Sequence, residues 1–500
     1  MENNISTKEE KISWTTQQTH VIDTRDGNLL VSAAAGSGKT AVLVERIIEM
    51  VLGTDSKGNR LMDKEPMDVD ELLVVTFTNA AAAQMKEKIG DALQKKVDAM
   101  MARGEHDEHL IRQMTLINHA NICTIDSFCL QIVKEYFAKV ELDSAFDIAD
   151  DTEMKILSHE VMDNVLERCY EDPELVKGFG TLVKTFARKE SDRAIPELVN
   201  SVVSVISSYP EPHKWIESAR KALDPGVTHE TGTKVKRRAV MDIPMVRAYG
   251  DRVRSIICTA LDMAVECQQY ANESYGLEAY GLRIDQDVAM LERLKDSCAS
   301  LEDIDLFELK DIYVDSLRPE GLKMEKDANG QSICYAFDRL VKPSRNADVE
   351  KQQFIKVRRD VYKPLITDIM SVITDADDVI SQTHMVAPLM SALLDLTELY
   401  MNEFMKVKME KNLFEFHDIE EFAFRILCDG ICDGKAVPSE TGREVAARYR
   451  EILIDEYQDS NFLQEYILGS VSGHGEGTGN MFMVGDVKQS IYRFRMARPD

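Results

Sequence analysis

The stretch NLLVSAAAGSGKT, residues 28–40, joins a short apolar run to small residues that end in a lysine and a threonine. Leu29, Leu30 and Val31 are typical of a buried strand, and the apolar residues from Val42 onwards have the spacing of a buried helix face. In a strand–turn–helix of this kind, the backbone N–H groups of the turn and of the helix N-terminus point at one place and bind phosphate. The stretch therefore predicts a phosphate-binding loop.

The residues of this loop have separate expected roles. Gly36 and Gly38 let the backbone approach a phosphate closely, Lys39 is placed to reach the outer phosphates of ATP, and the Thr40 hydroxyl is placed to bind Mg²⁺. The strict pattern G-x-x-x-x-G-K-[ST] is not met, because Ala33 stands at its first glycine. A glycine-rich turn with a chance lysine is the alternative. The candidate residues for ATP are Ala33, Ala34, Ala35, Gly36, Ser37, Gly38, Lys39 and Thr40.

A second candidate site follows the apolar run in EILIDEYQDS, residues 451–460. Strand alternation predicts that Asp455 and Glu456 point to opposite sides, so that one carboxylate serves Mg²⁺ while the other orients water. A further strand is predicted at residues 481–484, and Gln489 after it is placed to sense the γ-phosphate or the attacking water. The candidate catalytic residues are Lys39, Asp455, Glu456 and Gln489, and the candidate metal ligands are Thr40 and Asp455.

Two other segments carry side chains suited to ligands. The Gln18 amide, in WTTQQ ahead of the loop, suits the edge of an adenine base, although an ordinary glutamine at a helix start explains it when taken alone. Thr76, Phe77 and Asn79 follow a predicted buried strand, where hydroxyl and amide groups can contact DNA phosphates and an aromatic ring can stack on a base. The alternative for Phe77 is a place in the core.

Composition limits the class of protein. With 60 Lys and Arg against 87 Asp and Glu, the formal net charge is −27, so any DNA contact must use a local basic groove. The 44% hydrophobic and 29% charged content are those of a soluble globular protein. Nine cysteines without a C-x-x-C pair indicate reduced thiols, and no apolar run reaches the length of a membrane span. We therefore expect a cytoplasmic protein with no membrane contact.

The chain is expected to form an α/β fold, in which a parallel sheet carries both candidate sites. Residues 1–145 and 412–500 are expected to form the two parts of one P-loop NTPase domain. Residues 146–411 read as a large all-α insertion punctuated by prolines, with a second sheet not expected. Two basic groups in this insertion are either solvated faces or DNA contacts; they are Lys234, Lys236, Arg237 and Arg238, and Lys342, Arg345, Lys351, Lys356, Arg358, Arg359 and Lys363.

Taken in order, WTTQQ, AAAGSGKT, TFTNAAA, TIDSF, LIDEYQDSN and VGDVKQSIYRFR resemble the Q, I, Ia, Ic, II and III motifs of superfamily 1A helicases, the UvrD and RecB-like family with a RecA-like fold. The long insertion makes the chain most similar to the A subunits of AddAB helicase-nucleases. The resemblance implies ATP-driven 3′-to-5′ movement on DNA during repair of double-strand breaks. A UvrD-like repair helicase without a nuclease, and a non-catalytic DNA-binding or scaffold subunit, are the alternatives.

The resemblance also assigns residues and partners. It implies that Gln18 contacts adenine, that Asp455 is linked to Mg²⁺, that Glu456 is the general base and that Gln489 couples to the γ-phosphate. Expected partners are single- and double-stranded DNA and a second, AddB-like subunit in a heterodimer. A second RecA-like domain and a nuclease domain are expected outside this sequence. The candidate DNA-binding or coupling residues are Thr76, Phe77, Asn79, Thr124, Tyr492, Phe494 and Arg495.

Overall fold

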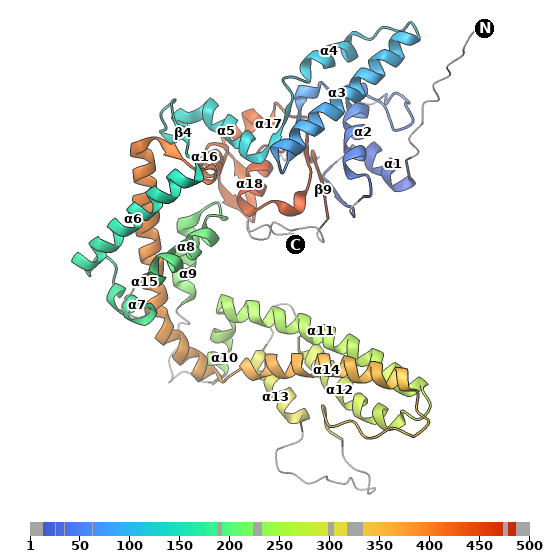
Figure 1. Cartoon of the computed structure of the whole chain (residues 1–500), viewed down its shortest axis with the longest axis vertical. Helices are drawn as coiled ribbons and strands as arrows, with labels where there is room; N and C mark the ends of the chain where they lie inside the picture. The colour runs from blue at the N-terminus through green and yellow to red at the C-terminus, as the bar shows by residue number, and fades with distance from the viewer. Residues whose placement is uncertain are drawn as a thin grey trace. The chain divides into compact units, whose positions relative to one another are not determined.

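A computed structural model describes residues 14–486, apart from residues 26, 35, 63, 188–192, 224–232, 299–304, 318–333 and 474–478. The chain forms two compact units (Figure 1). Unit 1 comprises Met1–Leu175, Ala187–Trp215 and Leu396–Asp500, and unit 2 comprises Val176–Phe186 and Ile216–Asp395. The exact limits expected for the insertion, residues 146–411, stay a prediction.

Unit 1 contains a parallel five-stranded sheet in the order β1-β9-β8-β2-β3. The first three of its strands in the sequence are separated from the last two by the long helical region, so distant parts of the chain build one sheet. The predicted α/β class with a parallel sheet is confirmed. The strands are β1 (Leu29–Ser32), β2 (Leu72–Thr76), β3 (Asn121–Thr124), β8 (Glu451–Ile454) and β9 (Met481–Gly485).

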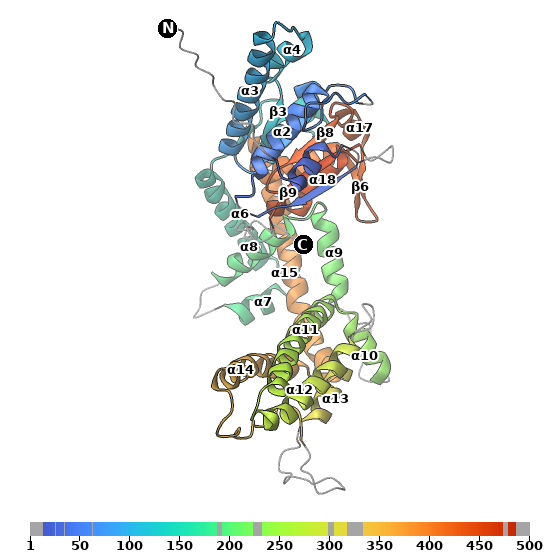
Figure 2. The ribbon, with the colours of Figure 1, turned by 90° about the vertical axis from the view of Figure 1, so that its right-hand side faces the viewer.

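Helices cover both faces of this sheet (Figure 2). One face packs against α2 (Lys39–Leu52), α3 (Asn79–Ala102) and α4 (Glu108–Leu116). The other face packs against α5 (Ile125–Tyr136), α16 (Phe416–Leu427) and α18 (Phe462–Ser470). Because apolar side chains alternate between these two layers, β2 and β8 are buried along their whole length.

The first strand differs from its prediction as a buried strand. β1 lies at the edge of the sheet, and its residues alternate between half-buried and exposed. Leu30 is 64% exposed. An edge strand pairs on one side only, and the apolar run by itself does not distinguish an edge strand from a central one.

The remaining elements of unit 1 include two short sheets that were not expected. A two-residue parallel pair joins β4 to β5, and the segment after residue 427 forms the antiparallel hairpin of β6 and β7. These strands are β4 (Asp147–Ile148), β5 (Leu413–Phe414), β6 (Cys428–Cys432) and β7 (Lys435–Pro438). The other helices that lie wholly in unit 1 are α1 (Thr16–Asp23), α6 (Asp151–Glu171), α8 (Ala194–Ile206) and α17 (Glu440–Ala446), with short 3-10 turns η1 (Val69–Glu71), η2 (Phe137–Val140) and η3 (Tyr457–Asp459).

Unit 2 is helical in its described part, as the sequence predicted for this region. Its core joins α11, α12, α13 and α14. Pro364, expected to separate helices, lies inside α14 instead. The helices are α7 (Phe179–Phe186), α10 (Thr233–Met241), α11 (Pro244–Glu273), α12 (Glu278–Ser297), α13 (Leu306–Ser316) and α14 (Val349–Val372), and α9 (Pro212–Ala222) and α15 (Ala376–Lys411) have residues in both units.

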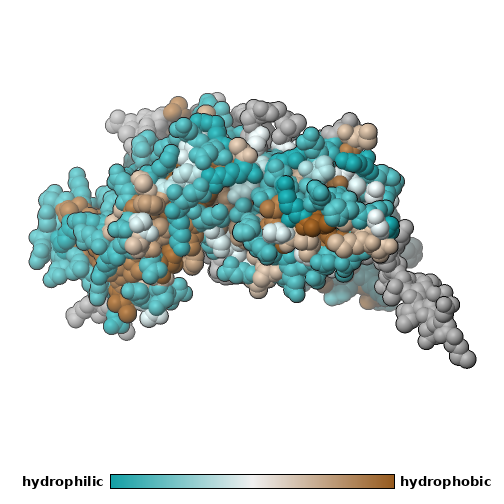
Figure 3. All heavy atoms as spheres, turned by 90° about the horizontal axis from the view of Figure 1, so that it is seen from above, coloured by the Kyte–Doolittle hydropathy of each residue, from teal (hydrophilic) through white to brown (hydrophobic). Residues whose placement is uncertain are grey.

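The surface is mostly hydrophilic on the face shown in Figure 3, with hydrophobic residues gathered in smaller groups. Among the helices that the structure describes, none is both long enough and apolar enough to cross a membrane.

Candidate nucleotide site

The loop between β1 and α2 has the backbone geometry that a phosphate-binding loop needs. Gly36 and Gly38 have φ angles of 74° and 84°, which only glycine adopts without strain. Gly38 is the N-cap of α2, so the free N–H groups of the helix N-terminus lie next to the loop. A hydrogen bond from Ala33 N to Gly485 O, 3.0 Å long, fixes the loop to the end of β9.

The acidic segment after β8 and this loop after β1 both lie at the carboxyl ends of the strands of the parallel sheet. The Nζ atom of Lys39 lies 3.0 Å from Oε2 of Glu456, across 417 residues of sequence. The Lys39 side chain is 10% exposed and that of Glu456 is 37% exposed. The lysine is therefore largely buried with a carboxylate as its counter-ion, and the carboxylate remains open to solvent.

The two adjacent carboxylates are not separated in the way that strand alternation predicted. β8 ends at Ile454, so Asp455 and Glu456 lie beyond the strand, and Glu456 has a left-handed backbone with φ of 54°. The backbone N–H of Glu456 donates to Oδ1 of Asp455 at 3.0 Å. Strand alternation therefore does not set the directions of the two side chains, because both residues lie in the turn after β8, and their separate roles stay predictions.

Asp455 is held in a half-buried position at the end of the sheet. Its backbone N–H donates to the carbonyl oxygen of Val75 at 2.9 Å, which ties it to β2. Burial, and then the neighbouring negative charge of Glu456, raise the pKa of Asp455 above its ordinary value. A bound cation would relieve both effects, so this carboxylate fits the role of a Mg²⁺ ligand.

Gln458 is a residue whose role the sequence reasoning missed. Its amide nitrogen donates to Oε2 of Glu456 at 2.8 Å, and its amide oxygen accepts from the backbone N–H of Asp486 at 2.9 Å. A side chain at Gly485 would bring its Cβ within 2.4 Å of this amide oxygen. Gln458 is buried and connects the acidic turn to the segment after β9; its position in DEYQD was the available signal.

The structure places Gln18 beside the loop. Its side-chain amide donates to the carbonyl oxygen of Ser37 at 3.0 Å, and its amide oxygen accepts from the backbone N–H of Thr15 in a capping box at the start of α1. Gln18 thus has both the ordinary role of a glutamine at a helix start and a position next to the loop. The adenine contact stays a prediction.

The candidate DNA residues that the structure describes lie at the ends of β2 and β3. The Thr76 hydroxyl is buried and donates to the Thr78 carbonyl, while Phe77 is half-buried and Asn79 is exposed at the start of α3. Thr124 is buried, and its side chain caps the N-terminus of α5. DNA contact by these side chains stays a prediction. Ala35, Gln489, Tyr492, Phe494 and Arg495 lie outside the described residues.

Several members of the two basic groups of the insertion are engaged within unit 2. Lys236 and Arg359 are buried, and they pair with Asp377 and Asp287 respectively. Other members also have partners: Arg237 pairs with Asp311, Arg358 pairs with Glu266, and the Lys363 ammonium donates to the Phe337 carbonyl. Neither alternative given for these groups, a solvated face or a DNA contact, fits the buried Lys236 and Arg359. Lys342, Arg345 and Lys356 are exposed.

Comparison with known proteins adds independent information. A family model described as the UvrD/REP helicase N-terminal domain matches residues 14–500. The chain is 37% identical over 493 residues to the A subunit of an ATP-dependent helicase/nuclease from Lachnoclostridium phytofermentans, covering 98% of this chain and 32% of the relative. Proteins with the same name from Clostridioides difficile and Lysinibacillus sphaericus are 34% and 33% identical, covering 97% and 99% of this chain and 35% and 37% of each relative. The chain thus spans about a third of the length of these relatives.

Proposed function

The chain belongs to the UvrD/REP helicase family, and from this premise we propose that unit 1 binds and hydrolyses ATP to drive a DNA helicase. The proposal assigns the protein to ATP-dependent 3′-to-5′ unwinding within a helicase-nuclease that processes double-strand breaks for recombinational repair. The names of the related helicase/nuclease A subunits support this assignment, and they also support the presence of a second, different subunit.

The observation that carries the proposal is the contact between Lys39 and Glu456. A lysine in a phosphate-binding loop needs a counter-ion, and here that counter-ion is the carboxylate proposed as the general base. Phosphate oxygens are stronger partners for the ammonium group than one carboxylate oxygen is. When the triphosphate binds, Lys39 exchanges Glu456 for the phosphates, and Glu456 is released to accept a hydrogen bond from the attacking water.

Three further residues complete the proposed chemistry. The Thr40 hydroxyl, at the start of α2, and the half-buried Asp455 carboxylate would hold Mg²⁺, which supplies charge neutralisation at the phosphates. Gln458 holds Oε2 of Glu456 and the backbone of Asp486 together. This link gives the general base a fixed orientation relative to β9.

Separate variants of Lys39 and Glu456 test the proposal in the full protein that carries this chain. Lys39→Ala is expected to weaken Mg·ATP binding at least tenfold, because the phosphates lose their cation. Glu456→Gln is expected to keep ATP and DNA binding within about threefold and to lower kcat for hydrolysis by roughly 10²-fold or more. Nucleotide binding is measured by calorimetry, and hydrolysis by phosphate release with single-stranded DNA.

The matched control is Lys86→Ala, which removes a lysine whose ammonium donates to the Asn118 carbonyl oxygen on the surface of unit 1. It should leave both ATP affinity and kcat near the wild-type values. If Lys39→Ala and Glu456→Gln weaken nucleotide binding equally, the two residues do not have the separate roles proposed here.

A further inference from the structure

Arg46 is a charged side chain in the interior of unit 1, where it is 1% exposed. It lies on α2, the helix that begins at Lys39 of the phosphate-binding loop. Burial of a cation is costly unless hydrogen bonds and an opposite charge compensate for the lost water. The chemistry proposed above does not involve this residue, so the contacts that hold it in the interior need a separate explanation.

The guanidinium group of Arg46 contacts three other segments of unit 1. One terminal nitrogen, Nη1, donates to the carbonyl oxygen of Val21 at 2.8 Å and also to that of Thr24. The other, Nη2, donates to Oε1 of Glu451 at 2.6 Å. The ring centroid of Phe482 lies 4.7 Å from the guanidinium carbon, close enough for a cation–π contact. Arg46 thus joins the end of α1, the start of β8 and the strand β9 to α2.

Val21 and Thr24 stand at the C-terminal end of α1, which ends at Asp23 with Thr24 as its C-cap. The last carbonyl groups of a helix lack partners within the helix, and a positive charge at this end is favoured by the helix dipole. α1 has eight residues, of which only Ile22 is buried, and a helix of this length is not stable by itself in water. Arg46 therefore caps α1 from the neighbouring helix.

Gln18 lies in the first turn of the same helix. Its side-chain amide donates to the carbonyl oxygen of Ser37 in the phosphate-binding loop at 3.0 Å. Asp23 makes a further contact by accepting from Ser56, but Ser56 belongs to a turn after α2 and not to the sheet or its covering helices. The position of Gln18 relative to the loop therefore depends on where Arg46 holds the other end of α1.

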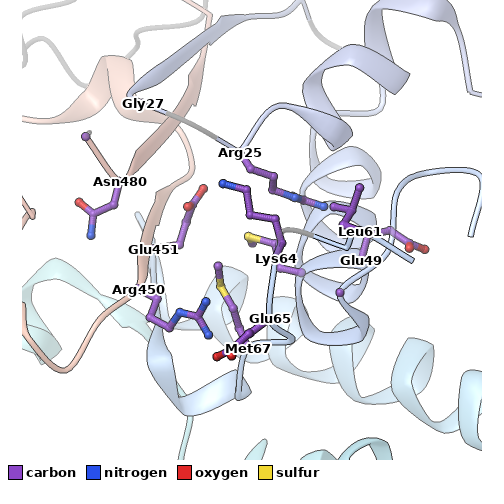
Figure 4. A pocket seen from close by; sticks show the side chains of 13 residues that line it. Arg25, Gly27, Glu49, Leu61, Lys64, Glu65, Met67, Arg450, Glu451 and Asn480 are labelled. Carbon is purple, nitrogen blue, oxygen red and sulfur yellow. The ribbon is translucent and has the colours of Figure 1, made fainter. Parts of the chain in front are cut away.

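Glu451 connects Arg46 to the centre of the sheet. It is the first residue of β8, a strand that pairs with β2 on one side and with β9 on the other. Figure 4 shows Glu451 in a pocket that Arg25 and Lys64 also line, and both of these cations interact electrostatically with its carboxylate. A carboxylate at the start of a central strand is held by the sheet, so its ion pair with Arg46 fixes the guanidinium group that caps α1.

We propose that Arg46 is a positioning residue for recognition of the nucleotide base: it fixes the C-terminal end of α1 to α2 and β8, and thereby holds Gln18 beside the phosphate-binding loop. The inference rests on the function proposed above, in which ATP binds at this loop, and on the expected contact of Gln18 with adenine. Arg46 is buried, so it acts through α1 and not by touching the nucleotide. Without Arg46, the Gln18 amide loses its place relative to the base, while the loop and Lys39 still bind the phosphates.

The test removes this ion pair from the full protein that carries the chain. Arg46→Met is combined with Glu451→Gln, so that neither partner leaves an unpaired charge in the core. Calorimetry measures the affinities for ATP, for GTP and for inorganic tripolyphosphate, which has no base, each with Mg²⁺. The double variant should lower the ratio of ATP affinity to GTP affinity by roughly fivefold, toward the value for Gln18→Ala. Its affinity for tripolyphosphate should stay within about twofold of the wild type, because the phosphate contacts of the loop are kept.

The matched control combines Lys408→Met with Asp418→Asn. This ion pair is also buried in unit 1, with 2.8 Å between Nζ and Oδ2, but it joins α15 to α16 and does not contact α1. The control therefore removes one buried cation and one buried carboxylate, as the Arg46 double variant does. It should leave all three affinities near the wild-type values. Amide hydrogen exchange in α1 should be faster in the Arg46 double variant and unchanged in the control.

Action through Gln18 is tested by adding Gln18→Ala to the Arg46 double variant. If Arg46 works by placing Gln18, its loss should lower the ATP-to-GTP ratio by less than about twofold beyond Gln18→Ala alone, because the contact that it positions is already absent. A further loss as large as the one seen with Gln18 present would overturn the proposal.

A wild-type ATP-to-GTP ratio in the Arg46 double variant would also overturn the proposal, as would an equal weakening of ATP, GTP and tripolyphosphate. If the double variant does not fold, Arg46→Lys replaces it; this variant keeps the charge but loses the planar pair of donors, and its ratio should fall about threefold. A wild-type ratio in Arg46→Lys would then overturn the proposal. Failure of the function proposed above has a different result, because Lys39→Ala would then leave the affinity for tripolyphosphate unchanged.

Discussion

At the residue scale, Gln18 has two roles that the structure brings together. Its side chain closes the capping box with Thr15 at the start of α1, and it donates to the Ser37 carbonyl of the phosphate-binding loop. A Cβ atom at Gly38 would lie 3.4 Å from the Gln18 amide nitrogen. The glutamine therefore contacts the loop, and helix capping alone does not require that contact.

Substitution of Gln18 separates these roles. Gln18→Ala should lower the preference for ATP over GTP by roughly tenfold, because an amide that reads adenine contributes about 1–2 kcal/mol of discrimination. Thr15→Ala is the control: it removes the other half of the capping box and should destabilise α1 by about 1 kcal/mol without changing the ATP-to-GTP ratio. Competition of each nucleotide against a fluorescent ATP analogue measures the ratio. An equal loss of selectivity in both variants would indicate that Gln18 acts only through the helix.

At the scale of elements, α12 and α14 are joined by a buried polar network in unit 2. Asp287 is completely buried and accepts hydrogen bonds from Arg359 at 2.7 and 3.2 Å, from the Tyr362 hydroxyl at 2.8 Å and from the backbone N–H of Phe337 at 2.6 Å. Burial and the negative charge of Asp287 raise the pKa of Tyr362. The network satisfies each of these groups, so it fixes how the two helices pack.

Removal of the Asp287 carboxylate should destabilise unit 2 strongly. Asp287→Ala leaves the Arg359 charge buried without its partner, which should lower the free energy of unfolding by about 3–5 kcal/mol. Asp360→Ala, an exposed position on α14, should change it by less than about 0.5 kcal/mol. Urea unfolding followed by circular dichroism measures both. If the two variants lose the same stability, the network is not what holds α12 to α14.

At the scale of the whole molecule, a net charge of −27 opposes DNA binding unless basic residues are concentrated locally. The structure leaves fewer candidate DNA contacts in the insertion, because Arg359 forms a buried ion pair with Asp287 and the buried Lys236 pairs with Asp377. Exposed Lys342, Arg345 and Lys356 remain the most accessible members of the second basic group. Any DNA contact by unit 2 is thus expected to depend on these side chains.

Replacement of Lys342, Arg345 and Lys356 by Ala tests this contact. If each neutralises a phosphate, the triple variant should bind duplex ends more weakly, and the slope of log K against log salt should fall by about 0.9 for each lost contact. ATP affinity should stay unchanged. The control replaces Lys95, Lys155 and Lys177, which are also exposed, and removes the same total charge. An unchanged slope in the first variant, measured by fluorescence anisotropy, would mean that these residues form only a solvated surface.

Local signals in the sequence predicted the phosphate-binding loop and the acidic segment. They also predicted the parallel α/β class and the family, and the family is confirmed by the comparisons. These features depend on residues that are neighbours along the chain: apolar periodicity, glycines in a turn and carboxylates after a strand. Short stretches carry such information completely, so the segments were identifiable before their places in the sheet were known.

The tertiary structure alone decided which distant residues meet. The sheet order places Lys39 3.0 Å from Glu456 and Gln458 against the Asp486 backbone. It also leaves Leu30 exposed on an edge strand. In unit 2, the packing of α12 against α14 places Arg359 in the core rather than on the surface. The physical reason is that burial and ion pairing depend on the neighbours in space, and a sheet whose strands come from both ends of the chain sets those neighbours without any local sequence signal.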